Sequence, residues 1–240
     1  NARLVQWWIG HYVEEQGRMP LAAVSPRDID SFLAKKEWSG TTRQQGFVYL
    51  RLFYNWLVRY EHLDRSPVQR AERPQAAPVH HLLTVPQVKR LIGLTSNCDR
   101  MRAWLVLGLF GGMRISEVGR ALPEHIEAVE IFVPQTKSTD PEPRPRFVPI
   151  LPALKRHLPK SWDCLSEDHI KRARTALAHE MGWDEWPQNC LRHTSASMHY
   201  AAWQDAGKTA YYLGHSSPKM VRERYARAVR KKEALSFWGL

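Results

Sequence analysis

Three short strings in the second half of the chain combine arginine, histidine and tyrosine side chains that could act on a phosphate group. A guanidinium is a rigid fork of donors that fits phosphate oxygens, and an imidazole can give or take a proton near neutral pH. A tyrosine hydroxyl can act as a nucleophile. The strings are residues 112–118 (GMRISEV), residues 189–194 (NCLRHT) and residues 213–218 (LGHSSP), with Tyr225 ten residues after His215.

Taken one at a time, these strings have ordinary structural explanations. Arg114 and Glu117 are three residues apart and fit a surface ion pair on one helix face. His193 fits a helical histidine with a satisfied ring, and His215 fits a cap that follows a glycine. Tyr225 shares a helical stripe with apolar neighbours, and this periodicity alone favours a core aromatic over a nucleophile.

Taken together and in this order, the strings resemble the motifs of the tyrosine recombinase (phage integrase) family. That family has a first box of the form G-[LM]-R-[IV]-S-E, a second of the form H-x-L-R-H-T, and a third, L-G-H-S, that precedes a tyrosine. It also has a lysine on a hairpin between the first two boxes, where this chain has Lys137. Residues 146–150 (RFVPI) are similar to the family's R-x-V-P-L strand, so the resemblance covers the whole of residues 83–240.

The resemblance implies a site-specific DNA recombinase or integrase that cuts and rejoins DNA through a 3′-phosphotyrosyl intermediate. Tyr225 would attack the phosphodiester, while Arg114 and Arg192 would hold its non-bridging oxygens and stabilise the transition state. Lys137 would protonate the 5′-oxygen leaving group, and His215 would donate a hydrogen bond to the phosphate. No metal or other cofactor is implied, because the cationic side chains would supply the charge and the covalent bond would retain the energy for religation.

Two further positions complete the implied site. Glu117 would hold its arginine or histidine partners in place. Asn189 departs from the pattern, because the family has a histidine three residues before Arg192. Asparagine can donate a hydrogen bond to phosphate but cannot act as an acid or base near neutral pH. Either Asn189 positions the phosphate while water or another group takes the tyrosine proton, or the enzyme is slowed. The presence of the other catalytic residues favours the first alternative.

The composition agrees with an anionic partner. The 240 residues include 35 Lys and Arg against 24 Asp and Glu, a net charge of +11, which favours nucleic acid first and an acidic membrane surface second. The longest uncharged apolar stretch, residues 103–113, is too short to span a bilayer, and no signal sequence opens the chain. The chain has no metal-binding or disulfide framework, because its three cysteines, Cys98, Cys164 and Cys190, are widely spaced. We therefore expect each of them to be a small buried residue. We also expect the protein to be located in a prokaryotic cytoplasm, with the nucleoid or in the host cell of a mobile element.

The pattern of the chain predicts two domains and a mostly α fold. Residues 64–78 are rich in proline and charge, so we place an N-terminal helical core-binding domain at 1–70, a linker at 71–82 and a catalytic domain at 83–240. A change to strand-like runs predicts a small antiparallel sheet. The expected elements are a helix starting at Ser25-Pro26, helices with capping boxes at Thr41/Gln44 and Thr84/Gln87, a buried helix at 102–110, a helix at 115–122, strands within 126–134 and 146–150, and helices at 166–181, 188–202, 204–213, 217–229 and 230–238.

The resemblance also implies how DNA is held. Its partner would be double-stranded DNA with an inverted-repeat core site, bound by a homotetramer on paired sites, with an accessory DNA-bending protein as a further candidate. The apolar tail after residue 230 could dock on its own domain, but the resemblance favours docking on a neighbouring protomer. A non-catalytic DNA-binding protein and a type IB topoisomerase-like enzyme remain the alternatives. The candidate DNA-contacting residues are Thr41, Thr42, Arg43, Gln44, Arg222 and Arg224.

Overall fold

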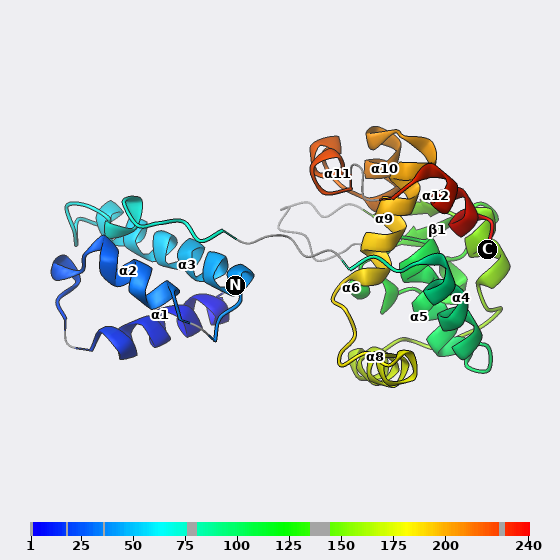
Figure 1. The fold of residues 1–240 in the computed structure, drawn as a ribbon, viewed down its shortest axis with the longest axis horizontal. Helices are drawn as coiled ribbons and strands as arrows, with labels where there is room; N and C mark the ends of the chain where they lie inside the picture. The colour runs from blue at the N-terminus through cyan, green and yellow to red at the C-terminus, as the bar shows by residue number, and fades with distance from the viewer. Residues whose placement is uncertain (1, 18, 36, 76–80, 135–144, 226–228) are drawn as a thin grey trace. The chain divides into compact units, whose positions relative to one another are not determined.

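The chain divides into two compact units, residues 1–79 and residues 80–240, in a computed structural model (Figure 1). The boundary between them lies within the predicted linker. Each unit is described by itself. The structure describes residues 2–17, 19–35, 37–75, 81–134, 145–225 and 229–240.

The first unit is built from helices around an aromatic core. Tyr12 and Tyr54 are fully buried and share a hydrogen bond between their hydroxyls at 2.9 Å. Phe47, Leu50, Tyr54 and Leu57 recur at helical spacing in the sequence, which predicts one buried stripe, and all four are buried on the third helix. The elements are α1 (Ala2–Gln16), α2 (Pro26–Leu33) and α3 (Gly40–Arg59), with 3-10 turns at Leu21–Ala23 and Pro67–Gln69.

The predicted start of α3 was wrong. The helix begins at Gly40, and its cap is Ser39, whose hydroxyl accepts a hydrogen bond from the Thr42 backbone N–H at 3.1 Å. Thr41, expected to be the cap, therefore lies inside the first turn. The segment SGTTRQ offers three hydroxyls in four positions, and cap preference alone does not choose among them.

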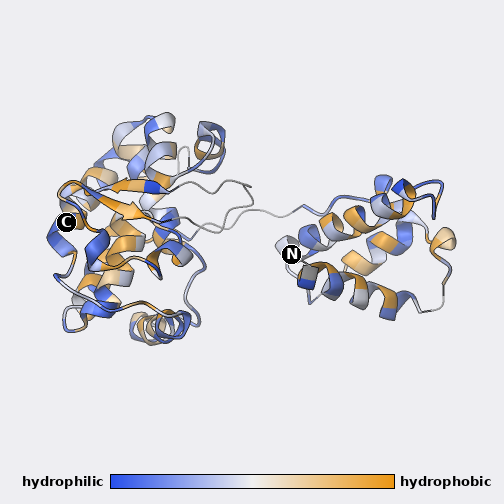
Figure 2. Cartoon of the chain, turned by 180° about the vertical axis from the view of Figure 1, so that it is seen from behind, coloured by the Kyte–Doolittle hydropathy of each residue, from blue (hydrophilic) through white to orange (hydrophobic). Residues whose placement is uncertain are grey.

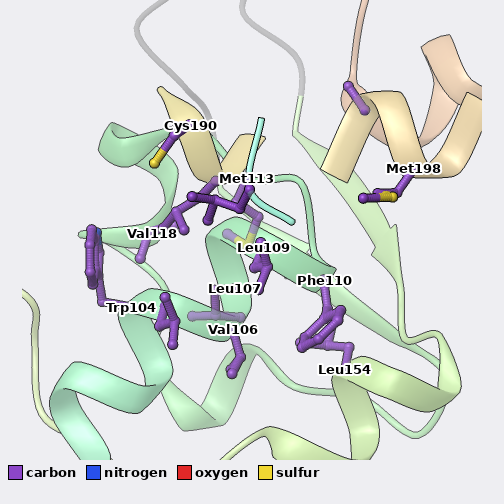
Figure 3. Packing of buried hydrophobic residues seen from close by; sticks show 14 of the residues in the cluster. Trp104, Val106, Leu107, Leu109, Phe110, Met113, Val118, Leu154, Cys190 and Met198 are labelled. Atoms are coloured by element: carbon purple, nitrogen blue, oxygen red, sulfur yellow. The ribbon is translucent and has the colours of Figure 1, made fainter. Parts of the chain in front are cut away.

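The second unit packs around one buried helix, α5 (Asp99–Phe110). Every residue from Ala103 to Phe110 is buried, which confirms the prediction from its all-round apolar pattern (Figure 3). Buried Ala and Leu side chains of neighbouring helices belong to the same hydrophobic core. The helices in contact with α5 are α4 (Val85–Leu94), α6 (Ile115–Val118), α7 (Pro152–His157), α8 (Glu167–Met181) and α9 (Cys190–Trp203).

A two-stranded antiparallel sheet pairs β1 (Glu130–Val133) with β2 (Arg146–Pro149) within the described residues. Val133 lies opposite Arg146, so the register places that arginine where the hairpin loop begins. The strands are largely hydrophobic, as Figure 2 shows, and their inward side chains join the core of the second unit. This sheet and the surrounding helices confirm the predicted fold class.

Several predicted boundaries in the second unit were wrong. The helix expected at 115–122 ends at Val118, and a 3-10 turn follows at Pro123–His125. The helix α7 was not predicted, because its six residues are too few to show a helical period. Cys98 and Cys164 are exposed, and only Cys190 of the three is buried as expected.

The C-terminal segment adds α10 (Ala206–Leu213), α11 (Pro218–Tyr225) and α12 (Lys231–Trp238). The tail helix α12 packs on α9 of its own unit, and Ala234 and Phe237 are fully buried there. His157 and Arg156 bind the backbone carbonyl of Leu240, which fixes the end of the chain. No helix of the described residues is long and apolar enough to cross a membrane.

Candidate active site

The first functional string forms a sharp turn between α5 and α6. Gly112 has φ +58°, and a Cβ there would lie 2.9 Å from both Leu213 and Tyr212, so glycine is required for this turn and this close packing. The turn makes Arg114 the N-cap residue of α6. Its guanidinium is partly exposed and donates a hydrogen bond to the Gly214 carbonyl at 3.2 Å.

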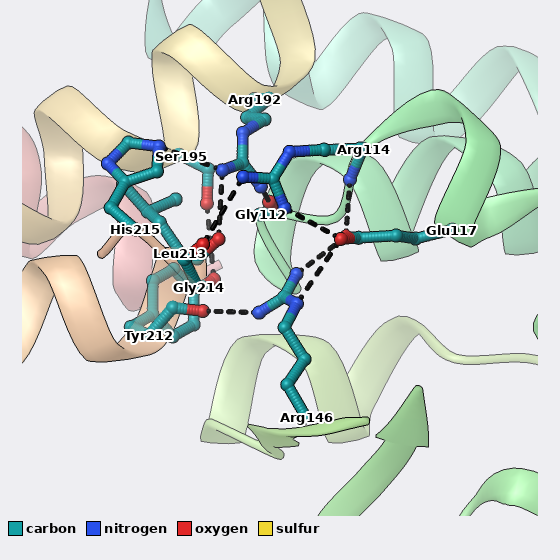
Figure 4. A network of polar contacts seen from close by, with 10 residues as sticks. All are labelled: Gly112, Arg114, Glu117, Arg146, Arg192, Ser195, Tyr212, Leu213, Gly214 and His215. Carbon is teal, nitrogen blue, oxygen red and sulfur yellow. Dashed lines mark hydrogen bonds and ion pairs between the residues drawn. The ribbon is translucent and has the colours of Figure 1, made fainter. Parts of the chain in front are cut away.

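Glu117 is the buried centre of the site, with 1% of its surface exposed. Its carboxylate accepts hydrogen bonds from the backbone N–H and the guanidinium of Arg114, both at 2.8 Å. It also accepts a hydrogen bond from the Arg146 Nη2 at 2.6 Å (Figure 4). Burial alone would raise the pKa of Glu117. The two arginines and the Arg114 N–H outweigh this effect and lower the pKa to about 2. Glu117 therefore stays ionised and holds two guanidiniums in fixed positions.

Arg192 and His215 form the opposite side of the same site. Arg192, from α9, donates hydrogen bonds to the carbonyls of Gly112 and Leu213, the latter at 2.8 Å. Its Nη2 also lies 2.9 Å from the His215 Nε2. An arginine has no acceptor, so this Nε2 accepts the hydrogen bond and the proton of the neutral ring sits on Nδ1. That Nδ1 is buried without a hydrogen-bond partner among the described residues.

The charges of the site do not cancel. The guanidiniums of Arg114, Arg146 and Arg192 surround one carboxylate, that of Glu117, so three cations minus one anion leave +2 in the described part of the site. Burial, followed by the nearby arginines, lowers the pKa of His215 to about 4. The same causes lower the pKa of Arg192. Unbalanced, partly buried positive charge of this kind favours an anionic ligand.

Tyr225 lies at the end of α11 and is 3% exposed. Its hydroxyl is 3.2 Å from the Nδ1 of His193, which is half-buried in the first turn of α9. Burial raises the pKa of Tyr225, while Arg192, Arg224 and Arg114 act in the opposite direction. Burial outweighs the arginines, so the pKa of Tyr225 stays above its usual value and the hydroxyl keeps its proton near neutral pH.

The structure brings together Arg114, Glu117, Arg192 and His215, four residues expected from the sequence. Asn189 is exposed at the N-terminus of α9, where its φ of 56° is a backbone conformation that asparagine tolerates better than most residues. Lys137 lies outside the described residues.

The candidate DNA-contacting residues lie on two helices, one in each unit. Thr41 is exposed in the first turn of α3, and Thr42 and Gln44 are half-buried. Arg43 donates a hydrogen bond to the Lys35 carbonyl at 2.8 Å, so its guanidinium also holds the first unit together. Arg222 and Arg224 are exposed on α11.

Two residues of the site were missed by sequence reasoning. Arg146 was noted only as part of a strand similar to the family's, yet it is the second arginine on Glu117 and also donates to the Tyr212 carbonyl at 2.9 Å. His193 was interpreted as a satisfied helical histidine, and its partner is the Tyr225 hydroxyl. Its position directly after Arg192 was the available signal. Among the described residues, no three His, Cys, Asp or Glu side chains are grouped to hold a metal ion.

The folded chain is similar to several solved structures at low sequence identity. A lambda integrase dimer bound to a COC′ core site matches with a TM-score of 0.75 and 15% identity, covering 95% of this chain and 88% of that chain. The Tn1549 transposon integrase in complex with circular intermediate DNA has a TM-score of 0.69 and 16% identity, with 95% and 90% covered. The XerH site-specific recombinase bound to palindromic difH substrate has a TM-score of 0.68 and 14% identity, with 99% and 78% covered.

No protein-family model matches the chain, and no curated protein matches it in sequence. The similarity to solved structures extends over nearly the whole chain, and these neighbours are tyrosine recombinases. The chain therefore has the tyrosine recombinase fold.

Proposed function

We propose that this chain is a site-specific DNA recombinase or integrase that cuts and rejoins DNA through a 3′-phosphotyrosyl intermediate. The observation that carries the proposal is the excess positive charge of the site, of which Arg114 and Arg192 act electrostatically on the Tyr225 hydroxyl. A DNA phosphodiester is an anion that fits such a site, and a buried tyrosine beside it is a suitable nucleophile. The fold is consistent with this activity.

In the proposed reaction, the Tyr225 oxygen attacks phosphorus in line with the 5′-oxygen that leaves. Arg114 and Arg192 bind the non-bridging oxygens, whose negative charge increases in the transition state. Arg114 and Arg146 are oriented by Glu117, and Arg192 is oriented by backbone carbonyls, so little reorganisation is needed when the phosphate enters. Lys137 is the proposed acid for the leaving oxygen.

His215 needs a tautomer change to act as proposed. Its Nε2 accepts a hydrogen bond from Arg192 in this structure, so it does not donate there. An entering phosphate would compete for the Arg192 guanidinium and would also raise the pKa of His215. His215 could then donate from Nε2 to a phosphate oxygen, as the resemblance implies.

The proposed partner is a DNA duplex with an inverted-repeat core site, bound by a tetramer on paired sites. Arg222 and Arg224 are exposed on α11, the helix that ends at Tyr225, where they can contact phosphates next to the cleaved bond. Thr41, Thr42 and Gln44 at the N-terminal turn of α3 are the proposed contacts from the first unit. Such a partner also agrees with a cytoplasmic location.

The tail helix α12 is the proposed link between protomers. In the single chain it covers Phe110 and Tyr212, with Phe237 5.0 Å from Phe110 between ring centroids. We propose that in the tetramer α12 occupies the same surface of a neighbouring protomer. A chain ending at Arg230 should bind single sites but fail to assemble on paired sites, whereas the same chain mixed with one that keeps α12 should assemble. Unchanged assembly by the shortened chain alone would contradict this link.

A covalent-trapping experiment tests the activity. The probe is a library of nicked duplexes whose arms carry a randomised inverted repeat, incubated with the protein in EDTA. We expect a protein–DNA adduct on a denaturing gel that is lost in Tyr225→Phe and kept in Tyr211→Phe, a variant of an exposed tyrosine on α10. An adduct in Tyr225→Phe would refute the nucleophile, and dependence on added metal would refute a metal-free reaction.

The trapping experiment and a relaxation assay on supercoiled DNA together separate the other functions. Binding without any adduct would indicate a non-catalytic DNA-binding protein, which the exposed Asn189 in place of histidine would then explain. Relaxation of supercoiled DNA by monomers, without products from paired sites, would indicate a topoisomerase-like enzyme.

A further inference from the structure

The Tyr225 hydroxyl must lose a proton when its oxygen attacks phosphorus, and Asn189 cannot accept it. The other groups of the site are poor acceptors as well. The lone pair of the His215 Nε2 is occupied by Arg192, and the Glu117 carboxylate is occupied by two arginines. Among these described residues, therefore, none is a base for the nucleophile.

The side chain of His193 lies next to the Tyr225 hydroxyl, where such a base is needed. Its Nδ1 lies 3.2 Å from the Tyr225 hydroxyl, which is hydrogen-bond distance, and the two ring centroids are 6.0 Å apart. The ring is half-buried, whereas the Asn189 side chain one turn earlier is exposed. The backbone N–H of His193 binds the Asn189 carbonyl at 2.9 Å, which holds His193 in the first turn of α9.

We propose that His193 is the catalytic residue that accepts the Tyr225 proton, in place of the histidine that Asn189 replaces. This inference rests on the proposed DNA-cleaving function. Nδ1 must be unprotonated beforehand, so the neutral ring carries its proton on Nε2.

The proposed step balances as follows. The O–H bond of Tyr225 breaks and its proton moves to Nδ1 of His193, while the tyrosine oxygen forms a bond to phosphorus. The bond from phosphorus to the 5′-oxygen breaks, and that oxygen takes a proton from the acid of the site. In religation the 5′-hydroxyl attacks phosphorus and returns its proton to the conjugate base of that acid. The bond from phosphorus to the Tyr225 oxygen breaks, and this oxygen recovers its proton from His193.

The neighbours of His193 suit this role. Arg192 precedes it directly, so one turn of α9 carries both a phosphate clamp and the base. The bound phosphate adds negative charge at this place, which offsets the positive charge that His193 gains with the proton. Burial raises the pKa of Tyr225 despite the nearby arginines, so its proton does not leave readily and an adjacent base is needed for the attack.

The test uses single-turnover cleavage of a nicked duplex that the trapping experiment has identified. His193→Asn places an amide oxygen close to the position of Nδ1, so it keeps a hydrogen-bond acceptor but removes the base. We expect cleavage to fall by about 100-fold, with unchanged DNA affinity and melting temperature. His179→Asn, a variant of an exposed histidine on α8, is the matched control and should cleave at the normal rate.

Difluorotyrosine at position 225 provides the second measurement, because its more acidic phenol needs less help from a base. In the His193→Asn background we expect it to recover roughly tenfold or more of the lost rate. A normal rate in His193→Asn, or a loss that difluorotyrosine does not recover, would overturn the assignment while leaving the proposed function intact. If the unaltered protein formed no adduct on any duplex, both proposals would fall.

Discussion

At the scale of single residues, the site depends on one carboxylate. Glu117 is buried and would be costly to ionise by itself, yet two guanidiniums and a backbone N–H stabilise its charge. The same contacts fix Arg114 on α6 and Arg146 on β2, two elements that meet only in the folded unit. Glu117 is therefore a positioning residue, and its loss should affect folding as well as phosphate binding.

Glu117→Gln should lower the free energy of unfolding by about 3 kcal/mol, because the two partly buried arginines lose their buried counter-charge. Urea denaturation followed by circular dichroism measures this difference. Glu124→Gln, at an exposed position six residues before β1, is the control and should change stability by less than about 0.5 kcal/mol. Equal stability of the two variants would show that the Glu117 charge is not needed.

The buried His199 predicts a loss of stability in acid. Burial, followed by Lys208, lowers its pKa from 6.5 to about 4. Between these values the unfolded chain binds a proton that the folded chain does not, so stability is complete above about 6.5 and falls as the pH drops towards about 4.

We expect His199 to account for about 2–3 kcal/mol of this loss, measured by urea denaturation across that pH range. His199→Phe keeps a ring to stack on Tyr212 and should reduce the slope. A slope remains from His215, whose pKa is also lowered. His179→Phe, at an exposed position, should leave the slope unchanged, and a flat profile in the unaltered chain would contradict the prediction.

At the scale of elements, the turn after α10 decides how the strand β2 meets the site. Gly214 ends α10 with φ +65°, and a Cβ there would lie 2.6 Å from Cδ of Arg146. The turn also presents its carbonyl to Arg114 and places His215 against Arg192. A glycine is therefore needed for two reasons, its backbone conformation and the space for the arginine.

A comparison of Gly214→Ala with Gly182→Ala separates the effect of the backbone conformation from the effect of the lost space for Arg146. Gly182 ends α8 with φ +72° but has no atom within 4 Å of an added Cβ, so its variant carries the backbone strain alone, about 1–2 kcal/mol. We expect Gly214→Ala to cost more than Gly182→Ala in urea denaturation and also to weaken DNA cleavage. Equal costs in the two variants would mean that Arg146 moves aside freely.

At the scale of the whole molecule, positive charge is present in both units. Residues 1–82 have 11 Lys and Arg against 8 Asp and Glu, and residues 83–240 have 24 against 16. A protein that binds a duplex through both units would contact many phosphates and release their counterions. Positive charge in both units supports affinity for DNA, but it does not determine which DNA sequence is bound.

The affinity for a duplex should therefore fall steeply with salt. For 6 to 10 phosphate contacts, raising the salt from about 50 to about 200 mM lowers the association constant by about 10³- to 10⁵-fold. Fluorescence anisotropy with a labelled core-site duplex measures this dependence. Arg222→Ala should reduce the slope of the log–log plot by about one, whereas Lys171→Ala, on the exposed face of α8, should not. An affinity that does not depend on salt would contradict DNA binding through phosphate contacts.

The fold was largely predictable where the signal is local. The buried stripe of α3, the all-round apolar α5 and the capping box of Thr84 and Gln87 depend on residues within a few turns of each other, and all are confirmed. Predictions failed where local signals compete or are too short. The cap of α3 had several candidate hydroxyls, and α7 is too short to show a period.

The sequence by itself determined the fold class, the order of the three functional strings and the residue types of a phosphate site. Only the tertiary structure decided which side chains meet. Arg146 reaches Glu117 across 29 positions, His193 reaches Tyr225 across 32, and Arg114 reaches Gly214 across 100. Such contacts depend on how helices and strands pack around α5, which no local pattern encodes. Packing thus brought Arg146 and His193 into a site where the sequence alone had assigned neither a role.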